Sequence, residues 1–223
     1  MHISKFSYQG SPNIGLYAHA TDDVCFVGTG LSNQKREQME AVLDVPVIEV
    51  SIAGTDLIGA FMASHNGTII LPEMLSDTEK KDIEDAADTV LYLNVMLNCL
   101  GNNIIFGKNA AIAHEAYSKE TVRALEKELD IEIVQRDIND VKAVGSLGVT
   151  NVGNNRMVFT NTVTEEEFSY VENILGLEAT STTVNMGSQH LHAGIICNCN
   201  GVLVGETSGG PEMTRIDEGL GFL

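Results

Sequence analysis

Turn-forming residues recur at an almost constant spacing along this chain, and this periodicity limits its fold more than any other feature does. Five candidate hairpin tips, each between two apolar runs, are Asp22, Asn66, Asn109, Asn154 and Asn200. Their successive spacings are 44, 43, 45 and 46 residues. Asn and Asp tolerate the positive φ angles of tight turns. The repeat runs through all 223 residues and predicts five similar units that bury their apolar faces against one another.

A second series of residues has the same period and predicts a helix in every unit. Hydroxyl side chains that can cap a helix lie at Ser32, Ser76, Ser118, Thr164 and Ser208. Glu79 and Glu167 follow the second and fourth of these by three residues, which is the capping-box spacing. After the caps, apolar residues such as Val122, Leu125 and Leu129 form one stripe at helical spacing. Each predicted helix therefore has one apolar face to bury.

The segments that follow the helices predict a third strand in each unit. They are rich in β-branched residues and cover 45–52, 89–95, 131–138 and 178–184. The fifth unit ends at Leu223 without such a segment, whereas residues 3–8 alternate like a strand before the first unit. Pairing the two ends would close a ring and leave no open edge strand.

We therefore predict an α/β fold: a closed, five-fold pseudosymmetric β/α propeller, with helices outside and strands inside. Residues 1–223 would form a single domain of five repeats, closed by the N-terminal strand. The alternative is an open solenoid, whose end units would carry polar caps instead of pairing. The incomplete fifth unit favours the closed ring.

Composition limits the partners and the location of the protein. Hydrophobic residues make up 43% of the chain and charged residues 20%, which is typical of a folded globular protein. No apolar run reaches the roughly 18 residues that a membrane span needs, and the first residues lack a signal sequence, so we expect a cytoplasmic protein. The formal charge of -18 argues against bare nucleic acid as a partner and favours a basic protein. The same charge could also serve solubility alone.

The residues that could carry chemistry do not form a convincing site. His190, His192, Cys197 and Cys199 are the one cluster of potential metal ligands, but in a continuous strand the histidines and the cysteines face opposite sides. A bend at Gly194 could realign them. No cysteine has a histidine base and an orienting carboxylate at a recognisable spacing. We therefore expect no metal, no cofactor and no catalysis.

A nucleotide site is also disfavoured. Gly28-Thr29-Gly30 follows a predicted strand, but Asn33 stands where the third glycine of a dinucleotide-binding turn would be. The loops between units are more informative: residues 51–55, 98–102, 139–140 and 185–188. By symmetry they gather on one rim, where small residues leave backbone groups accessible to a strand or tail of a partner protein. They could equally be tight connections only.

Four segments resemble the translation initiation factor 6 family. They are SIAGTDLIG at residues 51–59, LGNN at residues 100–103, VNMGS at residues 184–188 and the closing GETSGGPEMTRIDEGLGFL. The likeness covers the whole chain without a long insertion. Because the chain stops at Leu223, without the extra tail of the eukaryotic members, it looks archaeal.

The resemblance implies the pentein fold, a closed ring of five β/α units. It also implies a translation initiation factor that binds the large ribosomal subunit, prevents the small subunit from joining and takes part in large-subunit biogenesis. The partner would be chiefly a basic ribosomal protein of the L14 type beside the sarcin–ricin loop, with a minor rRNA contact. We expect a monomer.

The same resemblance implies binding residues. Asn102 falls on the family's Leu-Gly-Asn step, which faces the ribosome, and Gly15, Gly54, Thr55 and Gly101 fall nearby. Because the pentein fold also includes guanidine-modifying hydrolases and transferases with a cysteine nucleophile, such an enzyme is the alternative function. Its nucleophile would be Cys197 or Cys199, although the partner histidine and acids of those enzymes have no recognisable counterpart here.

Overall fold

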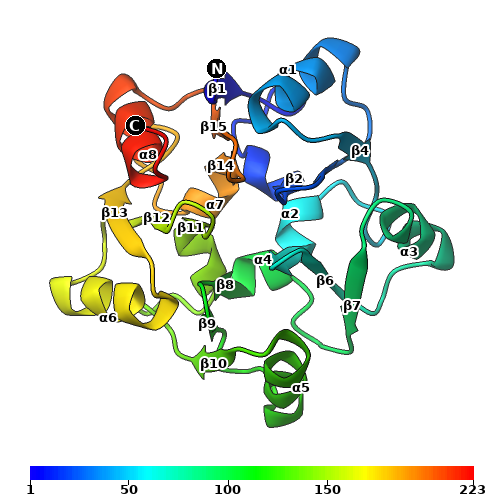
Figure 1. Cartoon of the computed structure of the whole chain (residues 1–223), viewed down its shortest axis with the longest axis vertical. Coiled ribbons are helices and arrows are strands. Elements are labelled where there is room, and N and C mark those ends of the chain that lie inside the picture. Colours follow the sequence, from blue (N-terminus) through cyan, green and yellow to red (C-terminus); the bar gives the residue numbers. More distant parts are fainter.

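The computed structural model describes residues 1–223 as a ring of five α/β units around a central axis, in the order of the sequence (Figure 1). Each unit contains one three-stranded sheet. The first strand of each sheet lies nearest the axis (Figure 1). These inner strands are β2 (Ala18–Ala20), β5 (Ala63–His65), β8 (Ile104–Phe106), β11 (Gly148–Asn151) and β14 (Ile195–Cys197). The predicted α/β fold of five repeated units is confirmed.

The second and third strands of every sheet follow one pattern. The second strand is antiparallel to the first, forming a hairpin: β3 (Cys25–Val27), β6 (Thr68–Pro72), β9 (Ala110–Ala113), β12 (Arg156–Thr160) and β15 (Val202–Gly205). The third strand is parallel to the second: β4 (Val47–Glu49), β7 (Thr89–Leu93), β10 (Glu132–Gln135), β13 (Glu178–Thr182) and β1 (Ile3–Phe6). All of the third strands are shorter than the segments that the sequence predicted.

A helix links the second strand to the third in the first four units, and a helix follows the second strand in the fifth. These outer helices surround the ring (Figure 1): α1 (Asn33–Leu43), α3 (Asp77–Glu84), α5 (Lys119–Leu129), α6 (Glu165–Leu175) and α8 (Gly210–Gly219). Four begin at the predicted hydroxyl caps. The predicted cap Ser208 is wrong, because α8 begins after Gly209 and the Ser208 hydroxyl accepts a hydrogen bond from the Asn185 N–H at 2.9 Å.

The two ends of the chain meet in the fifth sheet. β1 pairs in parallel with β15, with Ile3 opposite Val202 and Phe6 opposite Gly205, and so takes the place of the third strand. Nearby, His2 Nε2 lies 2.9 Å from the Asp217 carboxylate. The N-terminal strand and the C-terminal unit therefore hold each other at the top of the ring in Figure 1.

The hydrophobic core is divided into five clusters that join neighbouring units. In one of them, Met39 of α1 packs with Phe6 of β1 and Leu203 of β15. The helix of the first unit thus covers strands of the fifth. Another cluster unites Ile105, Phe159 and Val171 from the third and fourth units. No helix combines the length and apolar character of a membrane span.

Five short helices precede the inner strands, and none of them was predicted from the sequence. They are η1 (Ile14–Leu16), α2 (Ile58–Phe61), α4 (Leu100–Asn103), η2 (Val144–Leu147) and α7 (Leu191–Gly194). Each packs against its two neighbours around the axis. They form a small inner ring around the axis (Figure 1).

Candidate docking surface

Strand direction places all connections between units on one face of the ring. The second and third strands run parallel, away from the hairpin tips, so each third strand ends on the face opposite those tips. We call this the turn face and define it by five connecting turns, residues 8–11, 52–55, 95–98, 138–141 and 184–188. Because the short helices follow these turns, they close the same end of the ring.

Four of the five turns share a tight backbone geometry. An isolated β-bridge closes each of them, between Tyr8 and Ser11, Ile52 and Thr55, Ile138 and Val141, and Val184 and Ser188. Their tips have positive φ angles even at residues with side chains, including 52° at Ala53 and 63° at Met186. This backbone conformation costs about 1–2 kcal/mol at each such residue, and contacts with the surrounding structure must offset that cost. The backbone of these exposed turns is therefore held in one conformation by its surroundings.

Glycines let the short helices approach one another closely. A Cβ atom on Gly15 would lie 1.8 Å from the His192 carbonyl oxygen, and one on Gly101 would lie 2.0 Å from that of Gly59. The second residue of each short helix is a glycine in four of the five, including Gly145 in η2, whereas α7 has His192 at this position. Its Nε2 lies 3.0 Å from the Gly59 carbonyl oxygen, so this side chain reaches back into the inner ring.

The five residues predicted to bind fall into two groups. Gly54 is exposed and Thr55 half-buried in the turn of residues 52–55, and Asn102 is half-buried on α4. Gly15 and Gly101 are buried, each within the inner ring of short helices. The first group can touch a partner directly, whereas the second has a packing reason to be glycine.

The sequence reasoning missed the exposed methionines of the turn face. Met96 and Met186 lie in connecting turns with 98% and 81% of their surface exposed, and Met74 is 44% exposed. Met74 belongs to the same face, since the Asn98 amide lies 2.9 Å from its sulfur. Methionine side chains adapt to varied apolar partners. An apolar residue at the tip of a predicted turn, such as the methionine of VNMGS, could have indicated an exposed apolar side chain.

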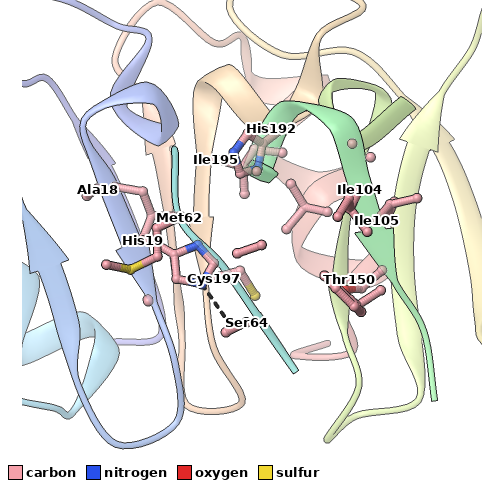
Figure 2. Close-up of a pocket in the computed structure, with 18 residues that line it drawn as sticks. Ala18, His19, Met62, Ser64, Ile104, Ile105, Thr150, His192, Ile195 and Cys197 are labelled. Atoms are coloured by element: carbon pink, nitrogen blue, oxygen red, sulfur yellow. Dashed lines mark hydrogen bonds between the residues drawn. The ribbon is translucent and has the colours of Figure 1, made fainter. Parts of the chain in front are cut away.

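A small central cavity of about 120 Å³ lies behind the short helices. It is lined by residues of the inner strands, including His19, Ser64 and Cys197, with His192 at the turn-face end (Figure 2). Toward the hairpin tips it widens into a hollow of about 430 Å³ bordered by Asp22 and Asn66. The larger hollow therefore lies at the hairpin-tip end of the axis.

The groups in this cavity are held in their neutral forms. Burial, with a smaller contribution from His192, lowers the pKa of His19 to about 3, and His19 Nε2 lies 2.8 Å from the Ser64 hydroxyl. Burial also lowers the pKa of His192 and raises that of the Cys197 thiol, with Asp22 adding to the latter. A thiol with a raised pKa is a poor nucleophile at neutral pH. No group of three or more His, Cys, Asp or Glu side chains is placed to hold a metal ion.

Comparison with known proteins decides the family. Residues 3–219 match the eIF-6 family. The chain belongs to that family. Translation initiation factor 6 of Thermococcus onnurineus is 32% identical to it over the full length of both chains. The factor of Picrophilus torridus is also 32% identical, over 98% of this chain and 99% of its own. These matches confirm the prediction that this eIF-6 family member is a translation initiation factor of the archaeal type.

Solved structures with a similar chain path are more distant. A dimethylarginine dimethylaminohydrolase has a TM-score of 0.48 at 12% identity, covering 76% of this chain and 68% of its own. The agmatine deiminase of C. jejuni has a TM-score of 0.43 at 11% identity, covering 76% of this chain and 64% of its own. Identities this low carry no statement about the chemistry of the eIF-6 family member.

Proposed function

We propose that this protein binds the large ribosomal subunit through its turn face and keeps the small subunit from joining by occupying the space between them. The full-length membership of the eIF-6 family carries the proposal. A stiff ring needs no chemistry to obstruct a partner, since its bound volume alone excludes the small subunit. A part in the biogenesis of the large subunit follows from the same placement.

The surface of the turn face supports protein contact. Gly54 is exposed there, Thr55 and Asn102 are half-buried, and the exposed Met96 and Met186 add apolar contact area. Buried apolar anchors with polar groups around them are typical of protein interfaces. In this proposal Gly15 and Gly101 shape the inner ring of short helices and so set the position of Asn102.

Charge supports a basic protein as the principal partner. The formal charge of -18 disfavours a contact made mainly to rRNA phosphates and favours complementary pairing with a basic surface. We propose that the main contact is a basic ribosomal protein of the L14 type, next to the sarcin–ricin loop, with the rRNA touched only at the edge. The protein would act as a monomer in the cytoplasm.

We further propose that the protein is not an enzyme. Of the two candidate nucleophiles, Cys197 has a pKa raised by burial, and burial together with Asp22 raises the pKa of Cys199 to about 11. Two histidines line the cavity, and neither is paired with a carboxylate: His19 is hydrogen-bonded to the Ser64 hydroxyl and His192 to the Gly59 carbonyl oxygen. These observations count against a guanidine-modifying hydrolase or transferase.

A subunit-joining experiment tests the function. Purified archaeal large and small subunits are mixed with increasing amounts of the protein, and joining is followed by light scattering. We expect joining to fall as the protein saturates the large subunit, and the protein to sediment with large but not with small subunits. Unchanged joining at saturating protein would refute the proposal.

A further inference from the structure

Three connecting turns of the turn face are tied to an outer helix by a glutamate. The three glutamates are Glu79, Glu167 and Glu212, each in the first turn of its helix, three residues after the N-cap residue. In each, one carboxylate oxygen accepts the N–H of the N-cap residue, and the other accepts an N–H from the connecting turn that leads into the same unit. We call these three side chains the turn anchors.

Glu79 shows most fully how the two carboxylate oxygens divide the donors between the helix cap and the connecting turn. Its Oε2 accepts the Ser76 N–H at 2.9 Å and the Ser76 hydroxyl at 2.8 Å. Its Oε1 accepts the Gly54 N–H at 2.8 Å and the Ser51 hydroxyl at 3.1 Å. Burial alone would raise the pKa of Glu79, but these hydrogen bonds outweigh it and lower the pKa, so the group stays charged at neutral pH.

The fourth and fifth units repeat the arrangement. Glu167 Oε1 accepts the Asn139 N–H at 2.9 Å, and this bond is the largest cause of the lowered pKa of Glu167. Glu212 holds two residues of its turn, with Oε1 at 2.9 Å from the Gly187 N–H and Oε2 at 3.1 Å from the Met186 N–H. Hydrogen bonds to an ionised carboxylate are among the stronger ones in proteins.

The anchored turns contain exposed residues with side chains and positive φ angles. Asn139 and Met186, whose own N–H groups are held, have φ angles of 51° and 63°, and Ala53, which precedes the held Gly54, has a φ angle of 52°. Water could satisfy a free turn N–H, but it would not select one backbone conformation. A carboxylate fixed by a helix cap does select one, because it accepts only from a turn placed at that distance.

The fold itself does not require the turn anchors. In α1 and α5 the equivalent residues are Lys35 and Thr121, and both helices form with ordinary hydroxyl caps. In the first unit, Gln9 instead donates to the Thr29 carbonyl oxygen at 3.1 Å. Both units form the same sheet and outer helix without an anchor, and the first also closes its turn with a bridge between Tyr8 and Ser11. The presence of an anchor in the other three units therefore calls for another explanation.

We propose that Glu79, Glu167 and Glu212 are positioning residues that hold the turn face in the shape that binds its partner. The inference rests on the proposed binding of the large ribosomal subunit through this face. Turns already fixed in the bound conformation lose less conformational freedom on docking, so binding is tighter without any added contact. None of the three needs to touch the ribosome.

The test separates the anchor from the helix cap with a matched pair of variants. Glu167→Gln keeps the size of the side chain but leaves one acceptor oxygen for two sets of donors, so the bond to the Asn139 N–H is lost or the cap is lost. Thr164→Ala removes the cap hydroxyl, which donates to Glu167 Oε2 at 3.1 Å, and leaves the bond to Asn139 in place. Glu79→Gln with Ser76→Ala is a second pair for use if the first does not fold.

Two measurements are made on each variant: amide hydrogen exchange of the turn, and affinity for large ribosomal subunits by co-sedimentation. We expect Glu167→Gln to speed exchange at Asn139 and to raise Kd about tenfold, the scale of one lost charge-assisted hydrogen bond. Thr164→Ala should lower Tm about as much as Glu167→Gln does. It should nevertheless leave amide exchange at Asn139 unchanged and keep Kd within about twofold of the wild-type value.

Other outcomes overturn the inference, each in its own way. Faster exchange with an unchanged Kd would mean that the anchor shapes the turn but not the binding. Equal weakening by both variants would assign the effect to general stability. If the wild-type protein does not bind large subunits, the proposed function fails. Unchanged exchange at Asn139 in Glu167→Ala, which keeps neither acceptor oxygen, would show that the anchor does not hold the turn.

Discussion

Replacing Gly101 by alanine tests whether the inner ring of short helices is a packing device. The new Cβ would lie 2.0 Å from the Gly59 carbonyl oxygen and 2.5 Å from that of Met62. Close carbon–oxygen contacts in proteins are about 3.3 Å or longer, so backbone atoms would have to move by about 1 Å. Both neighbours are main-chain carbonyls, which cannot rotate away as a flexible side chain could.

The expected loss of stability follows from two opposing effects. Overpacking a core costs about 1–3 kcal/mol when the surroundings can yield, and the upper end applies to a clash with backbone. Alanine is favoured over glycine in a helix by about 1 kcal/mol, which offsets part of that cost. We therefore expect Gly101→Ala to lower the free energy of unfolding by about 2 kcal/mol. For a chain of this length the Tm should fall by roughly 4–8 °C.

The assay is urea unfolding followed by circular dichroism, with Gly210→Ala as the matched control. Gly210 opens α8 in a helical conformation, and nothing lies within 4 Å of the position that its Cβ would take. The control should change the free energy of unfolding by less than about 0.5 kcal/mol. A Gly101→Ala protein as stable as the control would refute the packing argument. If it also lost ribosome binding, Gly101 would be a direct contact.

Four further outcomes are expected. The folded-state pKa of His19, about 3, lies below the usual 6.5, so the unfolded chain takes up the proton first as the pH falls. Between pH 7 and pH 5 this residue should lower stability by about 2 kcal/mol, and His19→Gln should reduce the measured drop by about that amount. Phe6→Ala should cost about 3–5 kcal/mol and shift one cooperative transition of all 223 residues, whereas two separate transitions would contradict a single domain of five repeats. Asn102→Ala should raise the Kd for large subunits about fivefold without changing Tm, and equal affinity would show that Asn102 is not a contact. Binding should weaken between 0.1 M and 0.5 M salt, and a salt-independent Kd would point to an apolar interface.

The repeated unit was predictable because its markers are local. A hairpin tip, a helix cap and an apolar stripe each act within a few residues, so they recur in the sequence wherever the unit recurs. The one wrong cap shows the limit of this reasoning. Ser208 has the right spacing, but its hydroxyl bonds to the Asn185 N–H in the preceding connecting turn, and Gly209 begins the helix instead.

The inner ring and the turn anchors were not predictable, because they depend on contacts between segments far apart in the chain. Helices of three or four residues, such as η1 and α4, are too short to show a period. The packing role of Gly15 and Gly101 appears only when Gly59 and His192 arrive from other units. The glutamates at 79 and 167 were visible as helix caps, but the second bond of each carboxylate was not. Whether the five predicted residues bind stays a prediction.

The pairing of β1 with β15 also sets the order in which the protein can be completed during its own synthesis. Ile3 is synthesised before its partner Val202, which follows about 200 residues later in the chain. Until then β1 has no strand to pair with, and α1 cannot complete the hydrophobic cluster around Phe6, because Leu203 of β15 is part of that cluster. Long delays of this kind slow folding and expose apolar surface. The parallel pair of β1 and β15 can therefore form only after Val202 has been synthesised, and the apolar face of β1 stays without its cover until then.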